Sequence, residues 1–81
     1  MEIKILGTNC PKCHALEKAT REIVETNHLN ATVTKVDDIM EIMNYNVMRT
    51  PAIVVNEKVE IKGRVPSDEE ILQVLLKYQT Q

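Results

Sequence analysis

The period of the hydrophobic pattern changes between Gly7 and Cys13, and this change is the strongest constraint on the fold. Residues 2–6 form a short run rich in Ile and Leu that is typical of a β-strand. From Pro11 onward, the apolar residues recur at helical spacing. The stripe predicted to face the core consists of Leu16, Thr20, Ile23, Val24 and Asn27. Proline suits the first helical turn, where its missing N–H has no partner to lose. The pattern therefore predicts a strand that leads directly into a helix, with both cysteines of the chain at the junction.

The remaining sequence predicts five more elements. They are a strand over 31–36, a short helix over 39–43 capped by Asp37-Asp38, a central strand over 52–55, an edge strand over 59–62, and a helix that opens with a capping box at 67–70. The order βαβαββα predicts an α/β fold with a four-stranded mixed sheet and helices on both faces. The first two strands are expected to be parallel and the last two antiparallel, because a helix joins the first pair and a tight turn joins the second. No repeat or linker divides the chain, so we expect a single domain over 1–81.

Composition narrows the class of protein. The net charge is −2 and no cluster of Lys or Arg is present, which argues against nucleic acid as a partner. No apolar run approaches the roughly 20 residues that a membrane span needs. The N-terminus resembles a strand rather than a signal peptide, so we expect a cytoplasmic protein. Met40, Met43 and Met48 could form an apolar contact surface near Thr50-Pro51, but because Trp and Phe are absent, Met40 and Met43 are predicted to fill the core. Met48 and Arg49 are predicted to be the surface contacts.

The spacing of Cys10 and Cys13 leaves several kinds of site open. Two thiols three residues apart form a dithiol that closes to a disulfide, and in a cytoplasmic protein such a pair is usually catalytic or metal-binding. A soft-metal chaperone for copper is one alternative, although its fold would end in a strand. His14 completes a haem-attachment pattern, but haem attachment belongs to exported proteins. A structural zinc site would need two further ligands, and His14 and His28 lie fourteen residues apart.

Three segments of the sequence carry a resemblance to a known fold. They are 7–13, Gly-Thr-Asn-Cys-Pro-Lys-Cys, the pair Thr50-Pro51 before the third strand, and 62–65, Lys-Gly-Arg-Val. Together with the element order, these segments resemble the thioredoxin fold in its minimal, glutaredoxin-sized form. Within that superfamily, the chain is most similar to small thioredoxin-like redox-active disulfide proteins. The resemblance implies that Cys10 is the attacking thiolate and Cys13 the resolving thiol. It also implies that a cis Pro51 faces the sulfurs.

The resemblance further implies that the backbone of Thr50 pairs with an extended substrate segment and that Gly63 lets a turn approach the active site. Asn9, Pro11 and Lys12 would be active-site neighbours, and Arg49 would contribute to substrate binding beside Thr50-Pro51. Asn9 stands where thioredoxins have a Trp, and Lys4 lies in the region where they have a buried acid.

The helix dipole and Lys12 are expected to lower the pKa of Cys10 below the usual value of roughly 8.5. The predicted function is a thiol–disulfide oxidoreductase that passes electrons to protein disulfides. We expect a monomer with no metal and no cofactor besides the disulfide itself. The expected electron donor is a flavin-dependent enzyme of the thioredoxin-reductase type, or a thiol pool.

Overall fold

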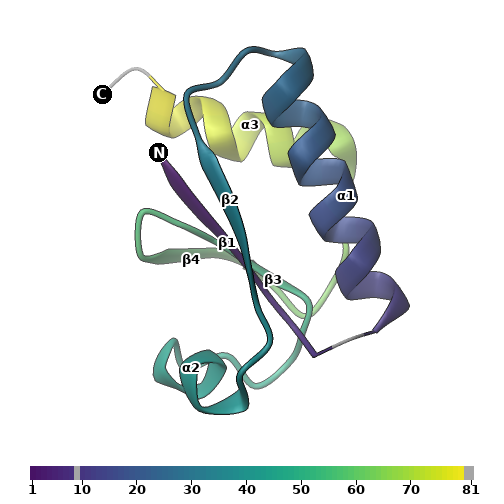
Figure 1. Cartoon of the computed structure of the whole chain (residues 1–81), viewed down its shortest axis with the longest axis vertical. Coiled ribbons are helices and arrows are strands. Elements are labelled where there is room, and N and C mark those ends of the chain that lie inside the picture. Colours follow the sequence, from purple (N-terminus) through teal and green to yellow (C-terminus); the bar gives the residue numbers. More distant parts are fainter. Residues whose placement is uncertain (9, 80–81) are drawn as a thin grey trace.

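The computed structural model describes residues 1–8 and 10–79, and in these residues seven elements follow one another (Figure 1). They are β1 (Glu2–Leu6), α1 (Pro11–Thr26), β2 (Thr32–Val36), α2 (Ile39–Asn44), β3 (Ala52–Val55), β4 (Lys58–Lys62) and α3 (Asp68–Gln79). The predicted order βαβαββα is confirmed. None of the helices in the described ranges is both long enough and apolar enough to cross a membrane.

The four strands form one mixed sheet in the order β2-β1-β3-β4. Strand β1 runs parallel to β2 and antiparallel to β3, and β3 and β4 are antiparallel, as predicted. At one end of the sheet, Leu6 pairs with both Val36 and Ala52, and Ala52 also pairs with Lys62. The segments that leave β1 and β4 and the segment that enters β3 therefore meet at this end, and α1 begins beside it.

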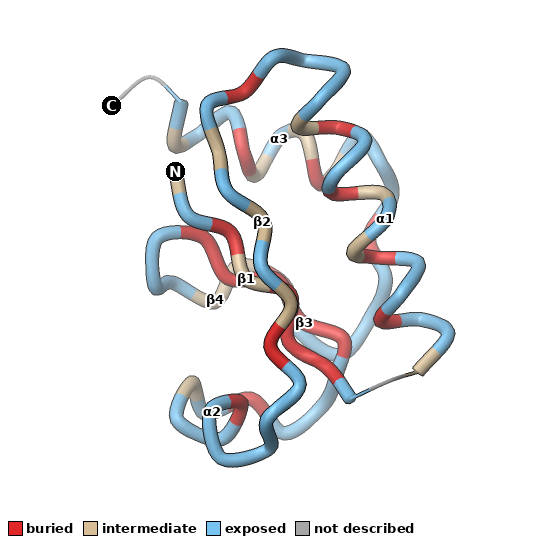
Figure 2. Tube along the Cα trace, in the orientation of Figure 1, coloured by how far each residue is buried: buried red, intermediate tan, exposed pale blue. Residues whose placement is uncertain are grey.

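Helices cover both faces of the sheet. Ile5 and Ile53 point to the face covered by α1 and α3, where they pack with Leu16 and Leu75 in the larger apolar cluster. The alternate positions point to the opposite face, where Leu6, Val36, Ala52 and Val54 pack with Ile42 of α2 and the following Val47. The central strands β1 and β3 carry most of the buried positions of the sheet (Figure 2). The prediction of helices on both faces is confirmed.

Helix α1 buries most of its predicted stripe, with one correction. Leu16, Thr20 and Ile23 are buried, and the Thr20 hydroxyl donates a hydrogen bond to the Leu16 carbonyl oxygen at 2.7 Å. Asn27 was predicted on this stripe, but it is exposed and forms the C-cap of the helix. Its side-chain amide donates to the Ile23 carbonyl oxygen at 2.9 Å, because the last carbonyls of a helix lack intrahelical partners. Leu29, beyond the helix end, is buried instead.

Helix α2 corrects the assignment of the methionines. Asp38 caps the helix as predicted, accepting a hydrogen bond from the Met40 N–H at 2.8 Å. Only Ile42 of this helix is buried. Met40 and Met43 were predicted in the core, but they are 70% and 61% exposed. A helix of six residues has a single narrow face against the sheet, so its other apolar side chains remain in solvent.

Candidate active site

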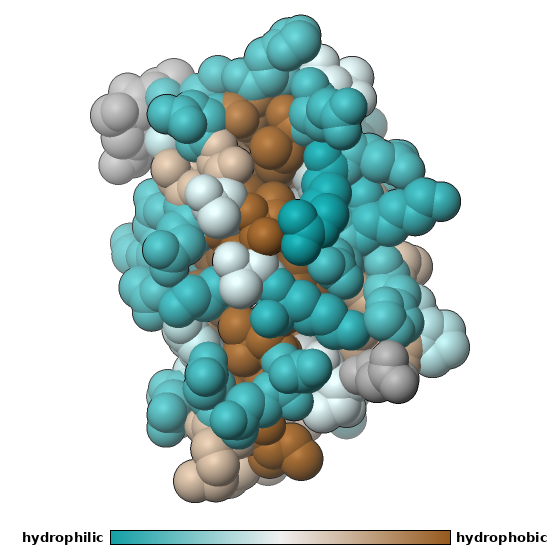
Figure 3. All heavy atoms as spheres, viewed as in Figure 1, coloured by the Kyte–Doolittle hydropathy of each residue, from teal (hydrophilic) through white to brown (hydrophobic). Residues whose placement is uncertain are grey.

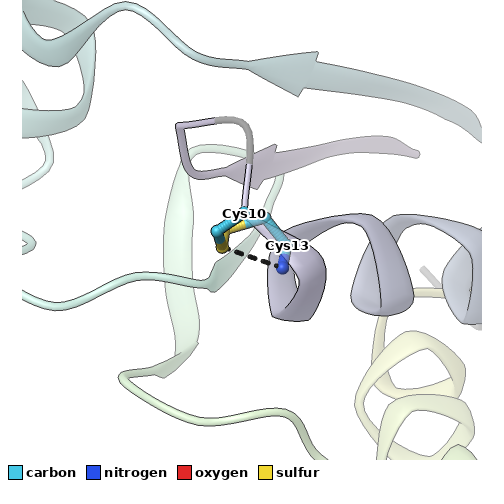
Figure 4. Close-up of a disulfide and its surroundings, with 2 residues drawn as sticks. All are labelled: Cys10 and Cys13. Atoms are coloured by element: carbon cyan, nitrogen blue, oxygen red, sulfur yellow. Dashed lines mark hydrogen bonds between the residues drawn. A yellow bond between two sulfur atoms is a disulfide. The ribbon is translucent and has the colours of Figure 1, made fainter.

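A disulfide between Cys10 and Cys13 lies where the loop after β1 meets the first turn of α1 (Figure 4). Their Cα atoms are 5.2 Å apart. Cys10 has an extended backbone (φ −118°, ψ 154°) and is the N-cap of α1, with Pro11 at the first helical position. The Cys10 side chain is partly exposed, whereas Cys13, one turn inside the helix, is fully buried. Of the two cysteines, Cys10 is therefore the one in contact with solvent.

The sulfur of Cys10 occupies the position of a helix-capping acceptor. The Cys13 N–H donates to Cys10 Sγ at 3.1 Å, and the His14 N–H donates to the Cys10 carbonyl oxygen at 3.0 Å. Amide N–H groups at a helix start lack intrahelical acceptors and carry a partial positive charge. The exposed side chain of Lys12 adds a cation in the same turn. These neighbours would stabilise a negative charge on the Cys10 sulfur after reduction.

Gly7 is a residue of this site whose role was not inferred from the sequence. It is buried, and a Cβ at this position would overlap Cys13 Sγ and come within 2.9 Å of the Cys13 Cβ. The same Cβ would lie 3.7 Å from the Cβ of Thr50. Gly7 therefore allows the buried sulfur to rest directly on the end of β1, with the Thr50 side chain beside it. The sequence showed Gly7 only as the end of the strand.

The segment that enters β3 lies beside the disulfide. The Thr50–Pro51 peptide bond is cis, Pro51 is buried and Thr50 is exposed. The Pro51 carbonyl oxygen accepts a hydrogen bond from the Gly63 N–H at 3.0 Å, which joins this segment to the turn after β4. Gly63 has φ +80°, a conformation that favours glycine. A Cβ on Gly63 would lie 3.3 Å from the Cβ of Arg49, so the Arg49 side chain passes close over this glycine.

The structure thus gathers most of the predicted site residues at one end of the sheet. Cys13 and Thr50 meet at Gly7, while Pro51 and Arg49 meet at Gly63. Cys10, Pro11 and Lys12 form the adjoining start of α1. The prediction for Asn9 lies outside the described residues.

Lys4, predicted in the region where thioredoxins carry a buried acid, takes part in a polar network instead. Its ammonium group donates to the Tyr45 hydroxyl oxygen at 2.8 Å and to Glu57 Oε1 at 2.9 Å, and the Tyr45 hydroxyl donates to Glu57 Oε2 at 3.0 Å. These hydrogen bonds raise the pKa of Lys4 above its usual value and lower the pKa of Glu57. Lys4 therefore joins β1 to the end of α2 and to the β3–β4 turn.

A metal centre has no support outside the disulfide pair. No three of the His, Cys, Asp and Glu side chains in the described part of the chain gather closely enough to hold a metal ion. The order of the described elements, βαβαββα, also differs from the fold of the copper-chaperone alternative. The site is instead that of a thioredoxin-fold protein with a redox-active disulfide.

Comparisons with known proteins agree with this class. The model of the family described as "Thioredoxin domain" matches residues 1–76. A thioredoxin from Methanothermobacter thermautotrophicus is 36% identical over 75 residues, which cover 93% of this chain and 97% of that protein. A thioredoxin from Methanocaldococcus jannaschii is 36% identical over 76 residues, covering 94% of this chain and 87% of that protein. The chain belongs to the thioredoxin family and is, in general terms, a thiol–disulfide oxidoreductase.

Proposed function

We propose that this protein reduces disulfide bonds in other proteins by cycling Cys10 and Cys13 between dithiol and disulfide. The observation that carries the proposal is the unequal exposure of the two cysteines in one disulfide, with Cys10 partly exposed at a helix N-cap and Cys13 fully buried. Because an attacking sulfur must reach its substrate, Cys10 is the nucleophile and Cys13 the resolving thiol. The reaction needs no cofactor besides these two sulfurs.

The proposed reaction has two exchange steps. The Cys10 thiolate attacks one sulfur of the substrate disulfide, so that a Cys10–substrate bond forms and the other substrate sulfur leaves as a thiolate. Cys13 then loses its proton and attacks Cys10 Sγ, which forms the Cys10–Cys13 disulfide and releases the second substrate thiolate. The leaving thiolates take up protons, and two electrons have passed from the protein to the substrate.

The segment around Thr50 would hold the substrate. Thr50 is exposed beside the disulfide, and its backbone is proposed to pair with an extended segment around the substrate cysteine. The hydrogen bond between Gly63 and Pro51 keeps the two neighbouring turns together at this place. The proposed donor of electrons is a flavin-dependent enzyme of the thioredoxin-reductase type or a thiol pool, and the proposed setting is the cytoplasm, with the protein as a monomer.

The two cysteine roles are tested with 5,5′-dithiobis(2-nitrobenzoate), a disulfide that releases a coloured thiolate when it is attacked. Cys13→Ser should react rapidly, release one coloured thiolate and retain the other half of the reagent on Cys10. Cys10→Ser should react far more slowly, because the remaining Cys13 is buried. Only the unmodified pair should then catalyse the reduction of insulin disulfides by dithiothreitol. A Cys10→Ser variant that reduced insulin at the parental rate would overturn the mechanism.

The donor is tested by a redox titration of the Cys10–Cys13 couple, with reduction attempted in parallel by a thioredoxin-reductase-type enzyme with NADPH and by glutathione. Rapid reduction by the flavoenzyme supports the thioredoxin-like assignment. Reduction by glutathione alone would make the thiol pool the donor and would indicate a glutaredoxin-like cycle.

A further inference from the structure

Two surface clefts share the exposed residue Met48, which precedes Arg49 and Thr50 on the segment beside the disulfide. The first, here called the apolar cleft, has a volume of about 340 Å³ and is lined by Thr8, Ile39, Ile42, Met43, Val47, Met48 and Thr50. The second, here called the basic cleft, has a volume of about 350 Å³ and is lined by Asn46, Met48, Arg49, Lys62 and Gly63. Thr50 lies beside Gly7 and Cys13, so the apolar cleft adjoins the disulfide, and the basic cleft adjoins the apolar cleft at Met48.

The apolar cleft exposes large side chains that a small soluble domain would ordinarily bury. Ile39 and Met43 are each 61% exposed, and Met48 is 97% exposed. In Figure 3, hydrophobic residues reach the surface at the lower end of the molecule, where Figure 1 places α2. Contiguous apolar surface of this kind marks interaction sites, and methionine side chains adapt to different apolar partners.

The basic cleft carries two cations without a carboxylate partner. Among the described residues, neither Arg49 nor Lys62 takes part in an ion pair, whereas the nearby Arg64 is paired with Glu70. The side chain of Arg49 passes over Gly63 and lines this cleft together with Lys62. An acidic group bound here would gain two charge-assisted hydrogen bonds.

The charged residues beside the apolar cleft differ in sign from those that line the basic cleft. Asp37 and Asp38 are exposed and directly precede Ile39, at the start of α2 beside the apolar cleft. They repel an acidic group on that side, whereas Arg49 and Lys62 attract it on the other. A partner with an apolar group at one side of its cysteine and an acidic group at the other therefore matches both clefts.

We propose that the preferred substrates of this protein carry, beside the reactive cysteine, an acidic side chain that binds the basic cleft and a large apolar side chain that enters the apolar cleft. The inference rests on the proposed function, because it places the substrate cysteine at Cys10. Arg49 and Lys62 would select the acidic side chain of the substrate. Ile39 and Met43 would select its apolar side chain.

The test uses short synthetic peptides with a single cysteine, blocked as a mixed disulfide with 2-nitro-5-thiobenzoate. The Cys10 thiolate attacks the peptide sulfur, a Cys10–peptide disulfide forms, and the coloured thiolate leaves and reports the rate. Three peptides are compared on the Cys13→Ser variant: one with Glu and Leu flanking the cysteine, one with Lys and Leu, and one with Glu and Gly. Each is made in both orders, and the faster order is used.

The Glu–Leu peptide should react about 3–10 times faster than either other peptide at low salt, and the advantage over the Lys–Leu peptide should shrink as salt is added. In the same background, Arg49→Gln and Lys62→Gln should each lower the preference for Glu over Lys. Lys58→Gln is the matched control, because Lys58 lies at the opposite end of β4 and the change in net charge is the same.

Met43→Ser should remove the preference for Leu over Gly. Met40→Ser is its control, since Met40 is exposed on the same helix but does not line the apolar cleft.

Equal rates for the three peptides, or equal effects of Lys62→Gln and Lys58→Gln, would overturn the inference while leaving the proposed function standing. Failure of the proposed function has a different signature, since Cys10→Ser would then reduce insulin at the parental rate.

Discussion

At the scale of single residues, the absence of a side chain at Gly7 decides how deep the second sulfur lies. The Cys13 Sγ rests on the backbone at the end of β1, and this contact keeps it fully buried. The burial separates the roles of the two cysteines, because the resolving thiol is reached only from Cys10. Gly7, which has no side chain, thus keeps the sulfur of Cys13 away from the surface.

Replacing Gly7 with alanine should force Cys13 away from β1. The new Cβ would overlap Cys13 Sγ, and such overpacking typically costs about 1–3 kcal/mol. We expect a lower free energy of unfolding in urea and slower release of a substrate bound to Cys10. Thr8→Ala is the control for stability, because Thr8 is adjacent and exposed. Unchanged stability and unchanged release in Gly7→Ala would contradict this account of the site.

Gly63 supports the site in a different way, through its backbone conformation. Gly63→Ala should be destabilising by about 1–2 kcal/mol, because a residue with a Cβ rarely adopts its φ of +80°. Asn tolerates this conformation better, so Gly63→Asn should recover part of the loss. Both variants place a Cβ close to Arg49, so the contact with Arg49 is disturbed in each. The difference between the two variants in the free energy of unfolding in urea therefore reports the backbone effect. Equal stability of Gly63→Ala and the parent would show that the turn relaxes freely.

At the scale of elements, a polar contact joins α3 to the edge strand β4. Glu60 accepts hydrogen bonds from Lys77, at 2.8 Å, and from the Tyr78 hydroxyl. The donor groups lower the pKa of Glu60, and the Glu60 carboxylate raises the pKa of Tyr78 to about 12. The stability that Tyr78 contributes is therefore complete below its usual pKa of 10.0 and is lost as the pH rises from there to about 12. The contribution of Glu60 is complete above 4.5 and is lost as the pH falls below that value.

Tyr78→Phe should lower the free energy of unfolding by about 1 kcal/mol near neutral pH, as expected for one partly exposed hydrogen bond to a charged group. The difference between parent and variant should vanish as the pH approaches 12. The measurement is urea unfolding across the alkaline range, together with the tyrosinate absorbance of both proteins. A difference that stayed constant through this range would mean that the bond between Tyr78 and Glu60 does not form in solution.

The elements themselves were largely predictable, and α2 shows where the prediction ended. The strands and the long helices could be predicted because their apolar residues recur every two or every 3.6 residues over a long enough stretch. Such a stretch specifies which face of the element is buried. In α2, four of six residues are apolar, namely Ile39, Met40, Ile42 and Met43, so the pattern does not specify which one faces the sheet. The structure buries Ile42 alone, and the others form surface that the sequence assigned partly to the core.

For the whole molecule, the sequence indicated the layers, the strand directions and the position of the disulfide at the start of α1. It did not indicate the contact of Gly7 with Cys13, the network of Lys4 with Tyr45 and Glu57, or the two clefts beside Thr50. The network and the clefts join residues from distant parts of the chain, and the contact of Gly7 with Cys13 depends on the path of the loop between them. Local periodicity carries no information on such contacts.

The two apolar clusters have a consequence for the redox cycle, since an oxidoreductase has to stay folded in both states. The disulfide closes a loop of only four residues, for which the loss of unfolded-chain entropy is worth about 2 kcal/mol. The clusters on the two faces of the sheet, around Ile53 and Val54, do not depend on it. Reduction should therefore lower the free energy of unfolding by about 2 kcal/mol or less and leave the far-ultraviolet circular dichroism spectrum unchanged. The Cys10→Ser/Cys13→Ser double variant should match the reduced parent with or without reductant. Loss of helical signal on reduction would show instead that the fold relies on the disulfide, and the protein could not then act as a reductant in its folded form.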